Sequence, residues 1–136
     1  MGHFHGNVVL PGAIDPADEV AVVNFVHSIL APHQPEQDEC FPLAFYSVVD
    51  KGWYSRVGYL AIDFPQALSG SNLVIVPVAA LLFNDEPYVF VAPDGEWHQS
   101  GSTYTSTEID ESWPKRFRSL AKAYKDRLSA VVYFKC

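Results

Sequence analysis

The chain is poor in the residues and segments that cross-link, export or anchor a protein. It has two cysteines, Cys40 and Cys136, and no N-terminal segment with the charged, apolar and small-residue order of a secretory signal. Because a domain without such a signal is expected in a reducing compartment, we interpret both cysteines as free thiols. Cys136 is the last residue, whereas a prenylation box has its cysteine fourth from the end. These absences predict a cytoplasmic protein without a lipid anchor.

Long apolar runs are also missing. The longest, residues 73–83, contains Pro77 and spans 11 residues, whereas a membrane-spanning helix needs about 20. We therefore expect this run to be core and expect no membrane partner. Only 18% of the 136 residues are charged and 49% are hydrophobic, so the chain can bury enough apolar surface to fold without cross-links. Its length predicts a single domain over residues 1–136.

Basic residues are scarce until the last 22 residues. Residues 1–114 hold Lys51 and Arg56 against 15 acidic residues, a net charge of −13, and residues 115–136 carry +6, which gives −7 in total. An acidic body repels phosphate backbones, so we expect no nucleic-acid partner. The composition favours a basic protein partner instead, although a negative net charge also simply keeps a cytosolic protein soluble.

Motifs of several large enzyme classes are absent. The sequence has no Gly-x-x-x-x-Gly-Lys-Ser/Thr loop, no Gly-x-Gly-x-x-Gly turn, no His-Glu-x-x-His helix and no paired Cys-x-x-Cys. The hydroxyl-rich residues 100–103 lack the Gly-x-Ser-x-Gly elbow of a nucleophilic serine. We therefore predict no cofactor, and expect a binding protein rather than an enzyme.

Two helices are predicted from capping signals and periodicity. Asp15 followed by Pro16 is typical of a helix start, and that helix is expected to run to Leu30. The second helix begins near Pro114. Its apolar stripe is Trp113, Phe117, Leu120, Ala121, Tyr124 and Leu128. Its opposite face carries a basic stripe, interpreted as a solvated face screened by nearby acids: Lys115, Arg118, Lys122 and Lys125.

Strand signals outnumber the helices. They cover residues 7–10, 43–49, 53–62, 73–83, 88–91, 96–104 and 129–134. Residues 50–52 and the Asp94-Gly95 turn are each expected to close a hairpin. Together these elements predict an α+β fold, with a mainly antiparallel sheet of about five to six strands and two helices packed on one face.

Two weak chemical patterns involve histidine. His3 and His5 have the spacing that puts two imidazoles on one side of a strand, but we interpret the N-terminus as frayed and predict no metal site. Cys40 with His27 or His33 has the residue types of a thiol nucleophile and its base, and we interpret the cysteine as a core residue instead.

Acidic turns with neighbouring aromatic residues are the feature we rank highest. They lie at residues 36–39, 85–88, 94–97 and 108–113, and three of the four carry Tyr or Trp. Aromatic side chains anchor protein interfaces, while clustered carboxylates steer a basic partner and accelerate its association. The candidate partner-binding residues are Asp85, Glu86, Tyr88, Asp94, Glu96 and Trp97.

These observations predict a small acidic protein-binding module of the inhibitor or immunity type, which protects a bacterial cell by neutralising a basic partner such as a toxic nuclease or effector. The alternative is a small enzyme or ligand-binding domain with a pocket between sheet and helices, lined by Glu96, His98 and Asp63. A third hypothesis is an assembly component with a self-complementary apolar patch. The sequence leaves the oligomeric state open.

Overall fold

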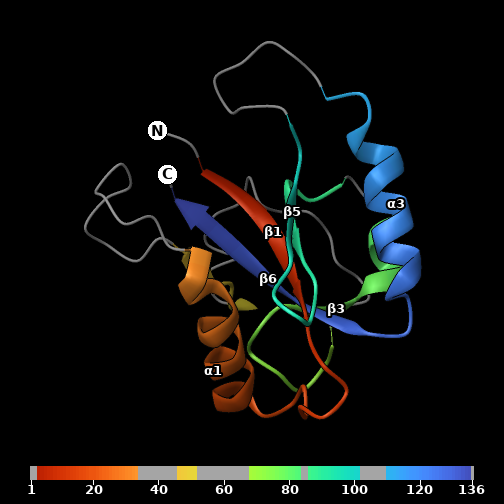
Figure 1. The fold of residues 1–136 in the computed structure, drawn as a ribbon. Coiled ribbons are helices and arrows are strands. Elements are labelled where there is room, and N and C mark those ends of the chain that lie inside the picture. The colour runs from red at the N-terminus through yellow and green to blue at the C-terminus, as the bar shows by residue number, and fades with distance from the viewer. Residues whose placement is uncertain (1–2, 34–45, 52–67, 84–85, 102–109, 136) are drawn as a thin grey trace.

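A computed structural model describes residues 3–33, 46–51, 68–83, 86–101 and 110–135, and the strands in these ranges form one mixed sheet (Figure 1). The strands are β1 (His3–Val9), β2 (Tyr46–Val48), β3 (Ile75–Pro77), β4 (Val89–Val91), β5 (Trp97–Gln99) and β6 (Leu128–Lys135). Their order is β2-β6-β1-β4-β5, and β3 also pairs with β6. All pairs are antiparallel except β1 with β4. The predicted α+β class and mainly antiparallel sheet are confirmed.

The centre of the sheet is the long antiparallel pair of β1 and β6. Its register runs from His3 opposite Lys135 to Val9 opposite Ser129. The backbone of β1 is therefore paired from His3 onward, and the expectation of a frayed N-terminus is wrong for these residues. The cause is the apolar terminal segment of β6, which supplies a partner strand along the whole length of β1.

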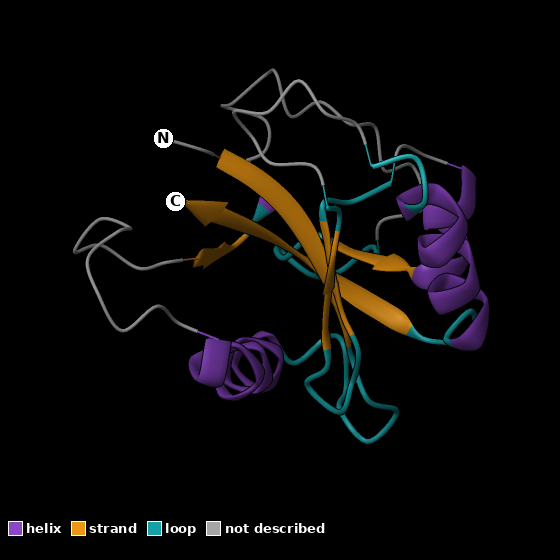
Figure 2. Cartoon of the chain, turned by 45° about the horizontal axis from the view of Figure 1, so that its top comes forward, coloured by secondary structure: helices purple, strands orange, loops and turns teal. Residues whose placement is uncertain are grey.

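The two helices cover opposite faces of the sheet (Figure 2). Helix α1 (Glu19–Leu30) packs on the face that includes Val8, and helix α3 (Trp113–Ala123) packs on the face that includes Val9. Our expectation that both helices lie on one face is therefore wrong. Consecutive residues of β1, β4 and β6 are apolar and fully or almost fully buried, so both faces of the sheet need a cover.

Helix α1 begins three residues later than the sequence predicts, because its N-cap is Asp18 and not Asp15. The Asp18 side chain accepts a hydrogen bond from the Ala21 amide at 3.1 Å and is the N-cap. Asp15 instead closes the preceding turn, where its carboxylate accepts from the Ala17 amide at 2.9 Å. Both Asp15 and Asp18 match the pattern of an N-cap. Asp18 is the one that caps the helix, and it lies directly before the apolar helical face. The chain after Leu30 continues as a 3₁₀ turn, η1 (Ala31–His33).

The apolar run at residues 73–83 is only partly a strand. Strand β3 ends at Pro77, and Val78–Phe83 forms a 3₁₀ helix, η3. Val78 and Leu81 are buried against the residues of α3, which explains why the run stays apolar without continuing as a strand.

Helix α3 is shorter than its apolar stripe. It ends at Ala123, and Leu128, which we placed on the helix, is the first residue of β6. Leu128 also accepts a hydrogen bond from the Leu10 amide through its carbonyl at 2.8 Å. The spacing of Leu128 fits a helix, but its pairing with Pro77 of β3 and its hydrogen bond with Leu10 determine its conformation.

Several predictions lie outside the described residues. These are the strand at 53–62, the ends of the strands at 43–49 and 96–104, and the state of Cys40 and Cys136. In the ranges that the structure describes, no helix has the length and apolar character required to cross a membrane.

Candidate functional site

The Asp94-Gly95 turn joins β4 to β5, as predicted. The Gly95 amide donates to the Ala92 carbonyl at 2.9 Å, and the Ala92 amide donates to the Glu96 carbonyl at 3.0 Å. Gly95 has φ +93°, a left-handed conformation that favours glycine, and Pro93 fits the preceding turn position. Asp94 accepts from the Glu96 amide at 2.9 Å through its side chain. These bonds fix the turn and leave both carboxylate side chains exposed.

Strand β5 directs neighbouring side chains to opposite faces. Trp97 is paired with Val91 and lies on the α1 side, whereas His98 is paired with Phe90 and lies on the α3 side. Glu96 lies on the same face as His98, because its carboxylate is 3.3 Å from the His98 Nε2. The candidate residues Glu96 and Trp97 are therefore adjacent in the hairpin but belong to different faces.

The Trp97 ring is held by packing on the α1 side. Its indole lies edge-on to Phe134, with centroids 5.3 Å apart, and is tilted against the His33 ring at 5.1 Å. His33 Nε2 is also within hydrogen-bond distance of the Gly95 carbonyl, at 2.9 Å. Sequence reasoning missed this role of His33, because 62 residues separate it from Gly95 and nothing local connects them.

The other candidate residues lie at the far end of β4. The Tyr88 amide donates to the His5 carbonyl at 3.2 Å, and Ser100 donates through its amide to the Tyr88 carbonyl at 2.9 Å. Tyr88 is partly buried against the α1-side core, and this burial raises the pKa of its hydroxyl. Along the strand, Tyr88 lies about 13 Å from the turn that holds Asp94. Glu86 shares this far end and is partly buried, and Asp85 lies outside the described residues.

Of the remaining acidic segments, the structure describes only residues 110–113. Residues 36–39 and 108–109 lie outside the described ranges. Trp113 is 4% exposed, and its indole N–H donates to the Pro87 carbonyl at 3.0 Å. This aromatic residue is therefore core and does not anchor a partner.

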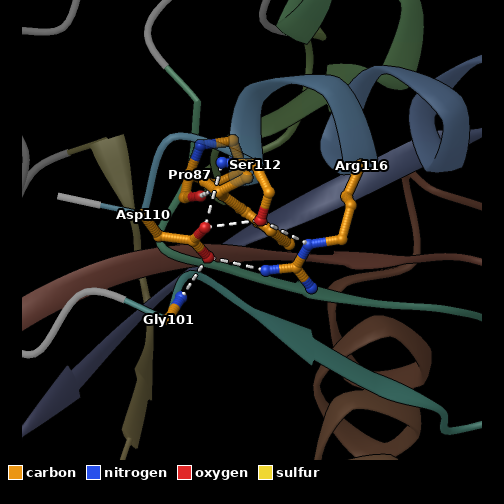
Figure 3. A network of polar contacts seen from close by, with 6 residues as sticks. Pro87, Gly101, Asp110, Ser112 and Arg116 are labelled. Carbon is orange, nitrogen blue, oxygen red and sulfur yellow. Dashed lines mark hydrogen bonds and ion pairs between the residues drawn. The ribbon is translucent and has the colours of Figure 1, made fainter.

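Asp110 is the centre of a polar network that joins the end of β5 to the start of α3 (Figure 3). One carboxylate oxygen accepts from the Gly101 amide and from the Arg116 guanidinium, both at 2.7 Å. The other accepts from the Ser112 hydroxyl at 2.5 Å and its amide at 3.0 Å. These bonds, led by those from the Ser112 hydroxyl and the Gly101 amide, hold the pKa of Asp110 well below its ordinary value.

We expect Asp110→Asn to destabilise the protein at pH 7 and to lose this effect in acid. A lowered pKa in the folded state means that the carboxylate contributes stability above the ordinary pKa of 3.8, and that the contribution diminishes as pH falls towards the folded-state pKa. Urea unfolding of the wild type and the variant between pH 7 and pH 2 measures this difference, because the loss begins only below the ordinary pKa of 3.8. Glu111→Gln, at an exposed neighbour, is the control. A destabilisation that is equal at every pH would contradict the expectation.

A hollow of about 400 Å³ lies between β5 and α3. Its lining residues are His98, Lys115, Arg116, Ser119 and Leu120. The alternative hypothesis placed Glu96 and His98 near a pocket between sheet and helix, and His98 does line this hollow. Asp63 lies outside the described residues. Sequence reasoning did not connect His98 with Lys115 and Arg116, because only the packing of α3 brings these residues together.

The other histidines occupy separate places. His27 Nδ1 forms a hydrogen bond with the Tyr46 hydroxyl, and burial raises the pKa of Tyr46. Of His3 and His5, only the His5 side chain is described, and it is partly buried. Because Cys40 lies outside the described residues, the structure does not test the thiol hypothesis.

The basic C-terminal segment forms a distinct charged surface. Its cations on α3 and the following turn are all exposed: Lys115, Arg116, Arg118, Lys122, Lys125 and Arg127. The exposed carboxylate of Glu96 lies 3.3 Å from His98, which lines the hollow, and the exposed Asp94 lies two residues earlier in the hairpin turn. Comparison of the chain with protein-family models, with curated proteins and with solved structures finds no match in any of the three.

Proposed function

We propose that this chain is a small protein-binding module of the inhibitor or immunity type, which neutralises a basic partner such as a toxic nuclease or effector in a bacterial cytoplasm. The observation that supports this proposal is the β4–β5 hairpin, whose turn carries two exposed carboxylates, Asp94 and Glu96, directly before the packed ring of Trp97 in the chain, with Glu96 and Trp97 on opposite faces of β5. Carboxylates steer a basic surface, and an aromatic ring supplies contact area at the interface.

The hairpin is organised before any partner binds. The Gly95 turn is closed by backbone hydrogen bonds, and contacts with Phe134 and His33 hold Trp97. A surface that is already ordered loses little conformational entropy on association, so more of its contact energy contributes to affinity.

The charge distribution favours the approach of such a partner to one surface of the molecule. A basic protein is repelled by the exposed cations of α3 and attracted by the carboxylates of the hairpin. Glu86 and Tyr88, at the far end of β4, extend the proposed surface along the hairpin. The basic partner would therefore approach the hairpin rather than the outer surface of α3.

The test begins with capture of partners from a lysate of the source organism on the immobilised protein, with elution by a salt gradient. A basic protein released at intermediate salt is then purified for stopped-flow kinetics. We expect Asp94→Asn with Glu96→Lys to slow association by about tenfold or more at low salt and to weaken its dependence on salt. The Asn side chain keeps an acceptor for the Glu96 amide, so the turn and the thermal stability should be preserved.

A matched control separates a local effect from net charge. Asp126→Asn with Glu111→Lys changes the net charge by the same amount, at two exposed positions outside the hairpin. We expect this pair to change the association rate less than about twofold. Equal slowing by both pairs, or an unchanged rate in the hairpin pair, would remove the hairpin as the interface, and the absence of any basic partner would contradict the proposed function.

A further inference from the structure

The hollow between β5 and α3, which we call the α3 hollow, gathers positive charge in a chain whose net charge is −7. Lys115 and Arg116 line it from the helix, and His98 lines it from the strand. We propose that the α3 hollow binds a small organic molecule through a phosphate group. This site adjoins the proposed partner-binding surface at Glu96, whose carboxylate is 3.3 Å from His98, but it does not rest on that function.

Lys115 is the first donor available to a ligand. Its side chain is exposed and forms no hydrogen bond or ion pair with any residue in the described ranges. A lysine ammonium has three N–H donors and a compact charge suited to phosphate oxygens. Its position in the first turn of α3 also places it at the positive end of the helix dipole, which favours an anion.

Arg116 is held in position before a ligand arrives. Its Nη2 donates to Asp110 at 2.7 Å, its Nε donates to the Ser112 hydroxyl at 3.4 Å, and its guanidinium carbon lies 5.2 Å from the centroid of the Trp113 ring (Figure 3). A guanidinium has five N–H donors, so two such bonds do not exhaust it. A fixed guanidinium loses less side-chain entropy when it binds phosphate than a mobile one does.

His98 completes the site from the opposite wall. Its side chain is 22% exposed, and its Nε2 is 3.3 Å from the Glu96 carboxylate. Glu96 is 65% exposed and therefore acts as a weak internal competitor that an entering phosphate can replace. We expect Glu96→Gln to strengthen phosphate binding, because it removes a negative charge beside the site without removing a donor.

The size of the hollow favours a small molecule over a polymer. About 400 Å³ lies in the range of small-ligand sites, and Leu120 gives the lining an apolar element against which an organic group can pack. A nucleic acid would meet the carboxylates of Glu96 and Glu111 beside the cations. Phosphate is favoured over carboxylate because its three terminal oxygens can meet donors from both β5 and α3, whereas one guanidinium already satisfies the two oxygens of a carboxylate.

The experiment is a titration of the whole chain with phenyl phosphate, with inorganic phosphate and with benzoate in turn. Binding is measured by calorimetry and by changes in the NMR signals of the His98 ring. We expect saturable 1:1 binding of phenyl phosphate that shifts the His98 signals, with weaker binding of inorganic phosphate and of benzoate. Lys115→Gln should weaken phenyl phosphate binding by about tenfold. Lys122→Gln, an exposed cation of the same helix that does not line the hollow, should weaken it less than about twofold.

Four results would overturn this proposal. Absence of saturation with phenyl phosphate removes the site. Equal weakening by Lys115→Gln and Lys122→Gln shows general attraction to the basic helix. Benzoate binding as tightly as phenyl phosphate removes the selectivity for phosphate, and inorganic phosphate binding as tightly removes the organic part of the ligand. Lys115 is exposed, so its variant should fold, and thermal unfolding verifies this. None of these results affects the test of the Asp94 and Glu96 surface.

Discussion

Replacing Phe117 with Ala is expected to lower the free energy of unfolding by about 3–5 kcal/mol. Phe117 is 1% exposed and lies at the centre of the contact between α3 and the sheet. Its ring is edge-on to Phe90, with centroids 5.6 Å apart, and is tilted against Trp113 at 5.9 Å. Truncation removes these contacts and leaves a cavity that the paired strands cannot close.

Urea unfolding of purified wild type and variant measures this loss. Leu120→Ala is the matched control, because Leu120 lies on the same helix but is only partly buried. We expect the control to cost about 1 kcal/mol. A loss below about 1 kcal/mol for Phe117→Ala would mean that α3 does not pack on the sheet through this face.

The second large effect is expected for Gly6→Ala in the middle of the sheet. Gly6 of β1 is opposite Val89 in the parallel pair with β4. A Cβ at position 6 would lie 2.7 Å from the Val89 carbonyl oxygen and 2.9 Å from the Val89 Cβ. Because the contacts are with backbone and with a β-branched side chain, β1 and β4 must separate to admit the methyl group. We expect a loss of about 3 kcal/mol or more.

Gly12→Ala is the control for this variant. A Cβ at position 12 would approach only the guanidinium of Arg127, the flexible end of an exposed side chain that can move away. We expect a change within about 0.5 kcal/mol, measured by the same urea unfolding. If Gly6→Ala were equally mild, the close parallel pairing of β1 with β4 would be incorrect.

The Asp94-Gly95 hairpin and the start of α1 show how much local sequence determines. The hairpin needed only a glycine that accepts positive φ and an aspartate that bonds the amide two residues on, and both act within five residues. The start of α1 depended on the same kind of short-range bond, and the sequence erred by three residues because Asp15 and Asp18 both satisfy the pattern.

The apolar pattern of β1, β4 and β6 also indicates that both faces of the sheet are covered, which our prediction did not take into account. Val8 and Val9 are neighbours that are both fully buried, which indicates a sheet covered on both faces. The prediction assumed that only one face of the sheet is covered, and therefore placed both helices on the same face. Leu128 shows a related limit, because its spacing continues the helical stripe although it is paired in the sheet with Pro77 of β3.

The sequence by itself determined the α+β class, the hairpin turn and the separation of a basic C-terminal segment from an acidic body, because these depend on composition or on bonds between near neighbours. Only the tertiary structure decided that α1 and α3 lie on opposite faces, that Trp97 and Glu96 point to different sides, and that His98 meets Lys115. Those arrangements depend on which buried surfaces pack together. Such packing is set by many contacts at once between residues far apart in the chain, so no local sequence pattern predicts it.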